Sequence, residues 1–133
     1  DELRERAAAL GIADDVRFVG WTSDADVAGL FRLSKAFLFP SFYEGFGLPV
    51  LEAMARGVPV ACSDRASLPE VAGDAALLFD PSDHRAIADA LERLLTDAAL
   101  AERLVAAGRE RVAQFTWART AELTLASYER AAA

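Results

Sequence analysis

The chain has 133 residues, which is enough for one compact domain but not for two. Apolar residues make up 53% of it, so it can bury a core and is not expected to be disordered. Its net charge is −7, from 14 basic and 21 acidic residues, whereas nucleic-acid-binding domains are usually basic. The charge therefore disfavours a nucleic-acid partner, but it leaves room for one small anion held at a helix N-terminus.

Cysteine usage and the lack of long apolar runs predict a cytoplasmic protein. The single cysteine, Cys62, excludes an internal disulfide and fits a reducing compartment. No apolar run approaches the roughly 18 residues that indicate a membrane span. The acidic pair Asp1-Glu2 is followed by no apolar stretch, so no signal peptide is expected.

The first part of the chain alternates between helix and strand patterns. Apolar spacing and turn residues predict a helix over 1–10, a short strand over 16–19, a helix that begins at Ser23 or Asp24, and an apolar strand over 36–39. Gly20 and Pro40 end the two strands.

The second part begins with a loop over 41–46, followed by a helix that has Pro49 in its first turn and ends at Gly57. The remaining elements are then predicted as strands over 59–62 and 76–79, a short helical turn over 68–71, and helices over 83–95, 97–114 and 117–131. The last helix carries Trp117, Leu123, Leu125 and Tyr128 for packing.

Short apolar strands that alternate with helices indicate parallel pairing, with helices on both faces of the sheet. The predicted fold class is therefore α/β, a doubly wound, Rossmann-like parallel sheet followed by C-terminal helices. Four strands are few for such a sheet, and the helix over 1–10 has no strand before it. We therefore expect the domain to be truncated at its N-terminal side, without its first strand and the phosphate-facing loop that follows it.

The segment that carries chemistry follows the predicted strand over 36–39 and reads PSFYEGFGLPVLEAMARG. Doubly wound sheets bind ligands at the carboxyl ends of their strands. Gly45 and Gly47 allow the backbone to approach a ligand closely. The N–H groups after Gly47 are the unpaired donors of a helix start, and with the helix dipole they form a seat for a diphosphate.

Two carboxylates flank this seat. Glu44 lies in the loop before it, and Glu52 lies one turn into the helix. A carboxylate can accept hydrogen bonds from two sugar hydroxyls, and an acidic residue commonly holds ribose beside a nucleotide site. Acidic residues also stabilise a helix N-terminus without any ligand. The prediction of a binding site therefore depends on the whole segment and not on either glutamate alone.

The string from Glu44 to Glu52, EGFGLPVLE, is similar to the E-x7-E motif of the retaining group 1 glycosyltransferases, which have the GT-B fold. Further stretches that resemble this family are Val16–Gly20, Pro59–Ser63, Leu68–Gly73, Ala76–Pro81 and Phe115–Trp117. The resemblance covers nearly the whole chain, and its motif is specific for the family but not for a substrate.

The resemblance implies a role for each residue of the motif. Glu52 would accept hydrogen bonds from the ribose hydroxyls, and Glu44, the catalytic candidate, would contact hydroxyls of the donor sugar. The loop at Trp21 and Thr22 would face the base, mostly through backbone atoms. Four backbone amides would line the diphosphate and the sugar: those of Gly45, Phe46, Gly47 and Leu48.

The family transfers a sugar from a nucleoside diphosphate sugar to an acceptor with retention of configuration, usually without an essential metal. The resemblance thus implies a UDP-, GDP- or ADP-sugar as substrate, with no cofactor and no metal. Residues 1–133 would form part of the C-terminal, nucleotide-sugar-binding domain. The N-terminal acceptor domain and the upstream Arg and Lys that clamp the diphosphate would be absent, so we expect the chain alone to be inactive and its parent enzyme to be active.

Two other interpretations remain open. The chain could be a non-catalytic nucleotide-sugar-binding or interaction module, or its fold could support a different reaction, such as that of an epimerase or a phosphorylase. An upstream Rossmann-like half of comparable size would favour the transferase.

The expected partners are the donor and the missing N-terminal domain, and contact with a membrane surface is expected only through that missing half. A truncated sheet also leaves an unpaired edge, which proteins rarely leave bare. This predicts either a homodimer through the edge or a first helix packed across it.

Overall fold

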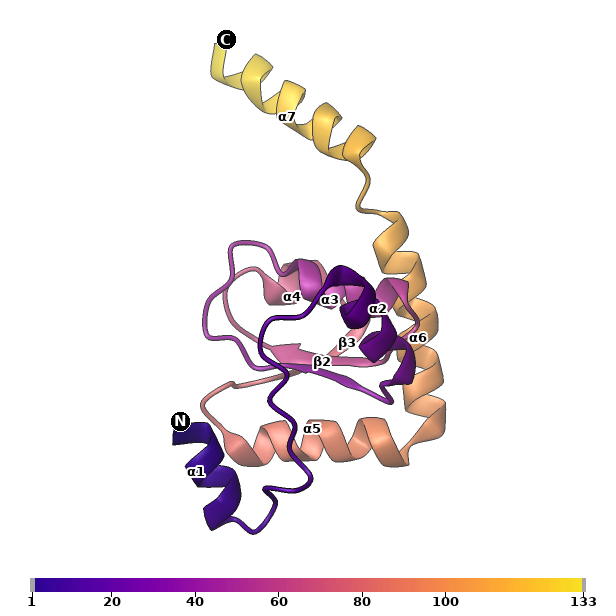
Figure 1. Cartoon of the computed structure of the whole chain (residues 1–133). Helices are drawn as coiled ribbons and strands as arrows, with labels where there is room; N and C mark the ends of the chain where they lie inside the picture. Colours follow the sequence, from indigo (N-terminus) through magenta and orange to yellow (C-terminus); the bar gives the residue numbers. More distant parts are fainter. Residues whose placement is uncertain (1, 133) are drawn as a thin grey trace.

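The computed structural model describes residues 2–132 and confirms the predicted α/β class (Figure 1). In chain order the elements are α1 (Glu2–Ala9), α2 (Asp24–Leu33), β1 (Phe37–Phe39), α3 (Leu48–Ala55), β2 (Val60–Ser63), α4 (Leu68–Ala72), β3 (Ala76–Phe79), α5 (His84–Thr96), α6 (Ala98–Ala113) and α7 (Trp117–Ala132). The three strands form a parallel sheet in the order β1-β2-β3. All but one of the predicted elements are present.

Helices cover both faces of the sheet because successive side chains of a strand point to opposite faces. Val60 and Cys62 of β2 belong to one core cluster with residues of α2, α3 and α4. Ala61 belongs to the other cluster, with residues of α5 and α6. Figure 1 shows α3 and α4 on one side of the sheet and α5 on the other. All four residues of β2 are buried, which explains the uninterrupted apolar run in the sequence.

Local signals set the helix boundaries. Ser23 caps α2 by accepting a hydrogen bond from the N–H of Asp26 at 3.2 Å, so Ser23 and not Asp24 is the cap residue. Pro49 lies in the first turn of α3, as predicted. The chain leaves α3 through Gly57, whose φ of 72° lies in the left-handed region that favours glycine.

The strand predicted over 16–19 is wrong. Residues 16–20 form no strand, and the side chains of Phe18 and Val19 are 38% and 58% exposed. A β-strand is held by hydrogen bonds to a neighbouring strand, and among the described residues no strand pairs with this segment. Phe18 instead lies beneath the guanidinium of Arg4, 4.5 Å from its ring centroid. The described sheet therefore has three strands instead of four.

The helix α7 contributes nothing to either core cluster. None of its residues is buried, and the Trp117 side chain is 90% exposed. Figure 1 shows α7 projecting away from the sheet and its covering helices. Its apolar side chains therefore remain available for packing outside this domain. No helix within residues 2–132 has the length and apolar character needed to cross a bilayer.

The edge of the sheet at β1 is short. β1 has three residues, all partly buried, and the ring of Phe31 in α2 packs edge-on against Phe37 with centroids 5.2 Å apart. Pairing of two copies through this edge stays a prediction.

The thiol of Cys62 is fully buried, and burial raises its pKa to about 12 because desolvation disfavours the thiolate. The thiolate is the form that reacts, so the folded chain should resist iodoacetamide at mildly alkaline pH. The same chain in urea should be labelled at this one cysteine. Mass spectrometry of both samples measures the difference, and rapid labelling of the folded chain would contradict the burial.

The same raised pKa predicts a dependence of stability on pH. The folded-state pKa of Cys62 lies above the value of 9.0 for a free thiol, so its contribution is complete below that pH. The contribution is lost as the pH rises toward 12. In urea titrations above about pH 9, the free energy of unfolding should therefore fall more steeply for the wild type than for Cys62→Ala.

Candidate functional site

The loop over 40–47 leaves the carboxyl end of β1 and leads directly into α3. Because β1 and β2 run parallel, with Phe39 opposite Cys62, the loop over 64–67 leaves β2 at the same end of the sheet, where the carboxyl ends of the strands lie. These two loops carry the polar groups of the candidate site.

Eight consecutive backbone N–H groups, from Ser41 to Leu48, have no acceptor in the part of the chain that the structure describes. The last four belong to Gly45, Phe46, Gly47 and Leu48, the residues predicted to line a diphosphate. The first N–H groups of a helix have no intrahelical partner, and they favour an anion. Gly47 is also buried, so its free N–H is a donor that water or a ligand must satisfy.

Gly47 is also required by the fold, independently of any ligand. It is the N-cap residue of α3, with a φ of 105°, which L side chains rarely adopt. A Cβ at this position would lie 2.6 Å from Cδ2 of Leu68 in α4. The Leu68 side chain thus fills the space beside the Gly47 Cα, and the glycine by itself does not indicate a ligand. Nothing lies within 4 Å of a Cβ built on Gly45.

Glu44 is partly buried and is held from one side. The Ser41 hydroxyl donates a hydrogen bond to Oε1 of Glu44 at 2.9 Å. The other carboxylate oxygen of Glu44 has no partner within residues 2–132. An acceptor of this kind, oriented but not saturated, can take a hydrogen bond from a sugar hydroxyl.

Glu52 lies on α3 with its side chain 48% exposed. Its carboxylate is 3.9 Å from the guanidinium of Arg56 one turn later, and Arg56 also donates to the Glu52 carbonyl at 3.0 Å. Arg56 in turn lies over the ring of Phe31, 5.3 Å from its centroid. An exposed ion pair at this spacing contributes little to stability, so the carboxylate can still accept from ribose.

Trp21 and Thr22 are not linked to this loop by any described hydrogen bond or ring contact. The Trp21 side chain is 91% exposed, and the Thr22 hydroxyl donates only to the carbonyl of Gly20, at 3.4 Å. Their predicted place beside a base stays a prediction.

Sequence reasoning missed one residue of the loop after β2, Ser67. The Ser67 hydroxyl lies 2.9 Å from the carbonyl oxygen of Glu44 and 2.8 Å from that of Phe46. A serine before a Leu-Pro helix start is expected to cap that helix, but Ser67 makes no such bond. Its real partners lie more than twenty residues earlier in the chain, so no local pattern could reveal them.

Arg65 lies in the same loop and is an exposed cation at the carboxyl ends of the strands. It pairs with Asp64 at 3.1 Å and with Asp80 at 2.8 Å. Hydrogen bonds from the hydroxyl and N–H of Ser82, with help from Arg65, lower the pKa of Asp80 to about 2. Arg65 is therefore engaged by two carboxylates and is not oriented toward the free amides by any described contact.

The segment between α6 and α7 also reaches this loop. The ring of Phe46 packs edge-on against Phe115, with centroids 5.7 Å apart. The guanidinium of Arg111 lies 4.8 Å from the Phe115 ring centroid and donates to the carbonyls of Val71 and Glu70 at the end of α4. The loop over 40–47 is thus supported from α4 and from the segment that leads into α7.

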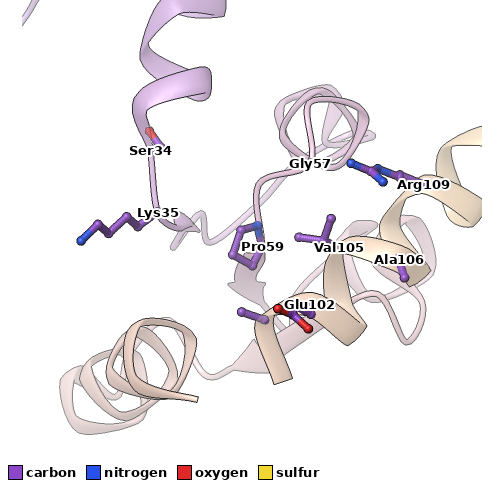
Figure 2. Close-up of a pocket in the computed structure, with 9 residues that line it drawn as sticks. Ser34, Lys35, Gly57, Pro59, Glu102, Val105, Ala106 and Arg109 are labelled. Atoms are coloured by element: carbon purple, nitrogen blue, oxygen red, sulfur yellow. The ribbon is translucent and has the colours of Figure 1, made fainter. Parts of the chain in front are cut away.

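A recess of about 500 Å³ lies at the opposite end of the strands from the candidate site (Figure 2). Lys35 precedes β1 and Pro59 precedes β2, so the recess lies at the amino ends of the strands. Figure 2 shows the Lys35 side chain pointing away from it, while Glu102 and Arg109 reach it from α6. It is separate from the candidate site. Within residues 2–132 no cluster of His, Cys, Asp and Glu side chains could hold a metal ion.

Comparison with known proteins gives one consistent result. Residues 1–111 match the model of the family described as "Glycosyl transferases group 1". The chain is 44% identical over 114 residues to the O-antigen chain mannosyltransferase B of Escherichia coli, covering 86% of this chain and 30% of that protein. It is 40% identical over 130 residues to the MMP alpha-(1->4)-mannosyltransferase of Mycolicibacterium hassiacum, covering 95% and 32%.

The chain is also similar to solved structures of a glycosyl transferase and a synthase. The sucrose-phosphate synthase of Thermosynechococcus elongatus matches with a TM-score of 0.82 and 34% identity, over 98% of this chain and 34% of that one. The C-terminal domain of a group 1 glycosyl transferase from Francisella tularensis matches with a TM-score of 0.75 and 29% identity, over 85% and 60%. The chain spans about a third of the length of these two mannosyltransferases.

The two glycines of the loop should respond differently to alanine. Gly47→Ala introduces a side chain at a positive φ and against Leu68, so it should lower the free energy of unfolding by about 2 kcal/mol. Gly45→Ala is the matched control, with open space and no positive φ, and should change it by less than about 0.5 kcal/mol. Urea titrations of the two variants measure this difference. Equal effects would contradict the described packing.

Proposed function

The chain belongs to the group 1 glycosyl transferases, and from this we propose that its residues 40–52 bind the diphosphate and sugar of a nucleoside diphosphate sugar. The observation that carries the proposal is the set of N–H groups without an acceptor at the start of α3, from Gly45 to Leu48, where Gly47 is buried. Glu44 and Glu52 flank this run with partly available carboxylates. We further propose that the parent protein transfers the sugar to an acceptor with retention of configuration.

In this proposal the chain acts by positioning and by electrostatics. The aligned amides and the N-terminus of α3 stabilise negative charge that grows on the leaving diphosphate. The free oxygen of Glu44 accepts from a hydroxyl of the donor sugar, and Glu52 accepts from the ribose. Groups fixed before the reaction reduce the entropy lost in reaching the transition state. The acceptor and the remaining diphosphate contacts come from parts of the protein outside this chain.

The names of the two curated relatives favour a mannosyl donor as the first one to test. Thermal unfolding with UDP, GDP, ADP and their mannose and glucose derivatives should identify a nucleotide that raises the Tm by a few degrees, because a ligand of the folded state stabilises it by mass action. An absence of stabilisation by every nucleotide would count against the proposed site.

Glu52→Ala should abolish most of the Tm increase that the identified nucleotide gives, because the ribose hydroxyls lose their acceptor. The matched control is Glu92→Ala, which removes an exposed glutamate from α5 on the other face of the sheet. That variant should keep the full increase. Stabilisation of Glu52→Ala equal to that of the wild type would remove the ribose role of Glu52.

We expect residues 1–133 to bind the donor without transferring its sugar. The measurement is release of nucleoside diphosphate from the donor, with simple sugars offered as acceptors and the complete parent protein as positive control. Release by the isolated chain above the uncatalysed rate would refute this expectation. A parent protein that binds the donor and releases nothing would favour the binding-module alternative.

A further inference from the structure

Ser67 is placed to cap its own helix but bonds to a different loop. It is the N-cap residue of α4, yet its side chain makes no capping hydrogen bond. A capping serine stabilises its helix, and Ser67 does not stabilise α4 in this way because its hydroxyl bonds elsewhere. Its hydroxyl instead lies 2.9 Å from the carbonyl oxygen of Glu44 and 2.8 Å from that of Phe46.

These two carbonyls determine where the neighbouring N–H groups point. A trans peptide unit is planar, with its C=O and N–H directed to opposite sides, and the described residues contain no cis peptide bond. The Glu44 carbonyl shares a peptide unit with the N–H of Gly45, and the Phe46 carbonyl shares one with the N–H of Gly47. With both carbonyls turned toward Ser67, both N–H groups are turned away from it.

Both of these N–H groups lack an acceptor within residues 2–132. The hydroxyl has one hydrogen and can donate to one carbonyl at a time, but both oxygens lie within reach of it. The next residue, Leu68, packs against the Cα of Gly47. The loop is therefore held at its carbonyls by Ser67 and at its glycine by Leu68.

We propose that Ser67 is a positioning residue for the nucleotide-sugar site, whose hydroxyl holds the Glu44 and Phe46 carbonyls so that the N–H groups of Gly45 and Gly47 stay aimed at the donor's phosphates. This inference rests on the proposed function. It assigns to the loop after β2 a share in donor binding without any contact to the donor itself.

The experiment compares Ser67→Ala with Ser67→Thr, which keeps a hydroxyl. The matched control is Ser82→Ala, which removes a hydroxyl that bonds to Asp80 and not to this loop. The probe is the nucleoside diphosphate that stabilises the wild-type chain most, titrated into ¹⁵N-labelled protein. Affinity and the amide signals of Gly45 and Gly47 are followed by nuclear magnetic resonance, and the Tm of each variant reports whether it remains folded.

Ser67→Ala should bind the nucleoside diphosphate roughly tenfold more weakly, the equivalent of about one net hydrogen bond. Its Gly45 and Gly47 amide signals should shift before ligand is added and should respond less to it. Ser67→Thr should retain most of the affinity, and Ser82→Ala should retain all of it. Rescue by threonine separates the hydroxyl's role from a general loosening of the fold.

Each other result has a defined meaning. If the wild type binds no nucleoside diphosphate, the proposed function fails and this inference fails with it. If the wild type binds and Ser67→Ala binds equally well, the inference fails while the proposed function stands. If Ser67→Thr is as weak as Ser67→Ala, the hydroxyl does not position the amides and the inference is overturned.

Discussion

The parallel pairing of β1 with β2 is the interaction on which the candidate site depends. It places Phe39 opposite Cys62, so the chain leaves both strands at the same edge of the sheet. The loop with the free amides and the loop with Ser67 are neighbours for this reason alone. The pairing is stable because β2 is buried on both faces, between the cluster of α2, α3 and α4 and the cluster of α5 and α6.

Some residues of the site have a structural role within the protein, and others have polar groups that no described residue contacts. Gly47 is required by its positive φ and by the Leu68 side chain, and Glu52 has an ion-pair partner one turn away. The four N–H groups and one oxygen of Glu44 have no use within the described residues. Buried polar groups without a partner are uncommon, and among these N–H groups only that of Gly47 belongs to a buried residue. This N–H therefore points to a ligand more strongly than the glycine conformations do.

The segment before α7 connects this loop to the most exposed part of the chain. Phe115 packs on Phe46. Two residues after Phe115, Trp117 begins α7, a helix that has no buried residue. Arg111 fixes the end of α6 by donating to two carbonyls of α4. A protein surface that packed on α7 would therefore lie next to a helix whose first residue is two positions from a contact with the loop over 40–47.

The sequence by itself determined most helices and strands, the doubly wound class and the location of the free amides. These follow from local rules: a period of two or 3.6 residues, a cap such as Ser23, and a glycine such as Gly57. The tertiary structure alone decided that 16–19 is not a strand, because a strand also needs a neighbour. It alone decided that Ser67 serves the loop over 40–47 and not its own helix. That contact joins residues more than twenty positions apart, and only the register of β1 against β2 brings them together.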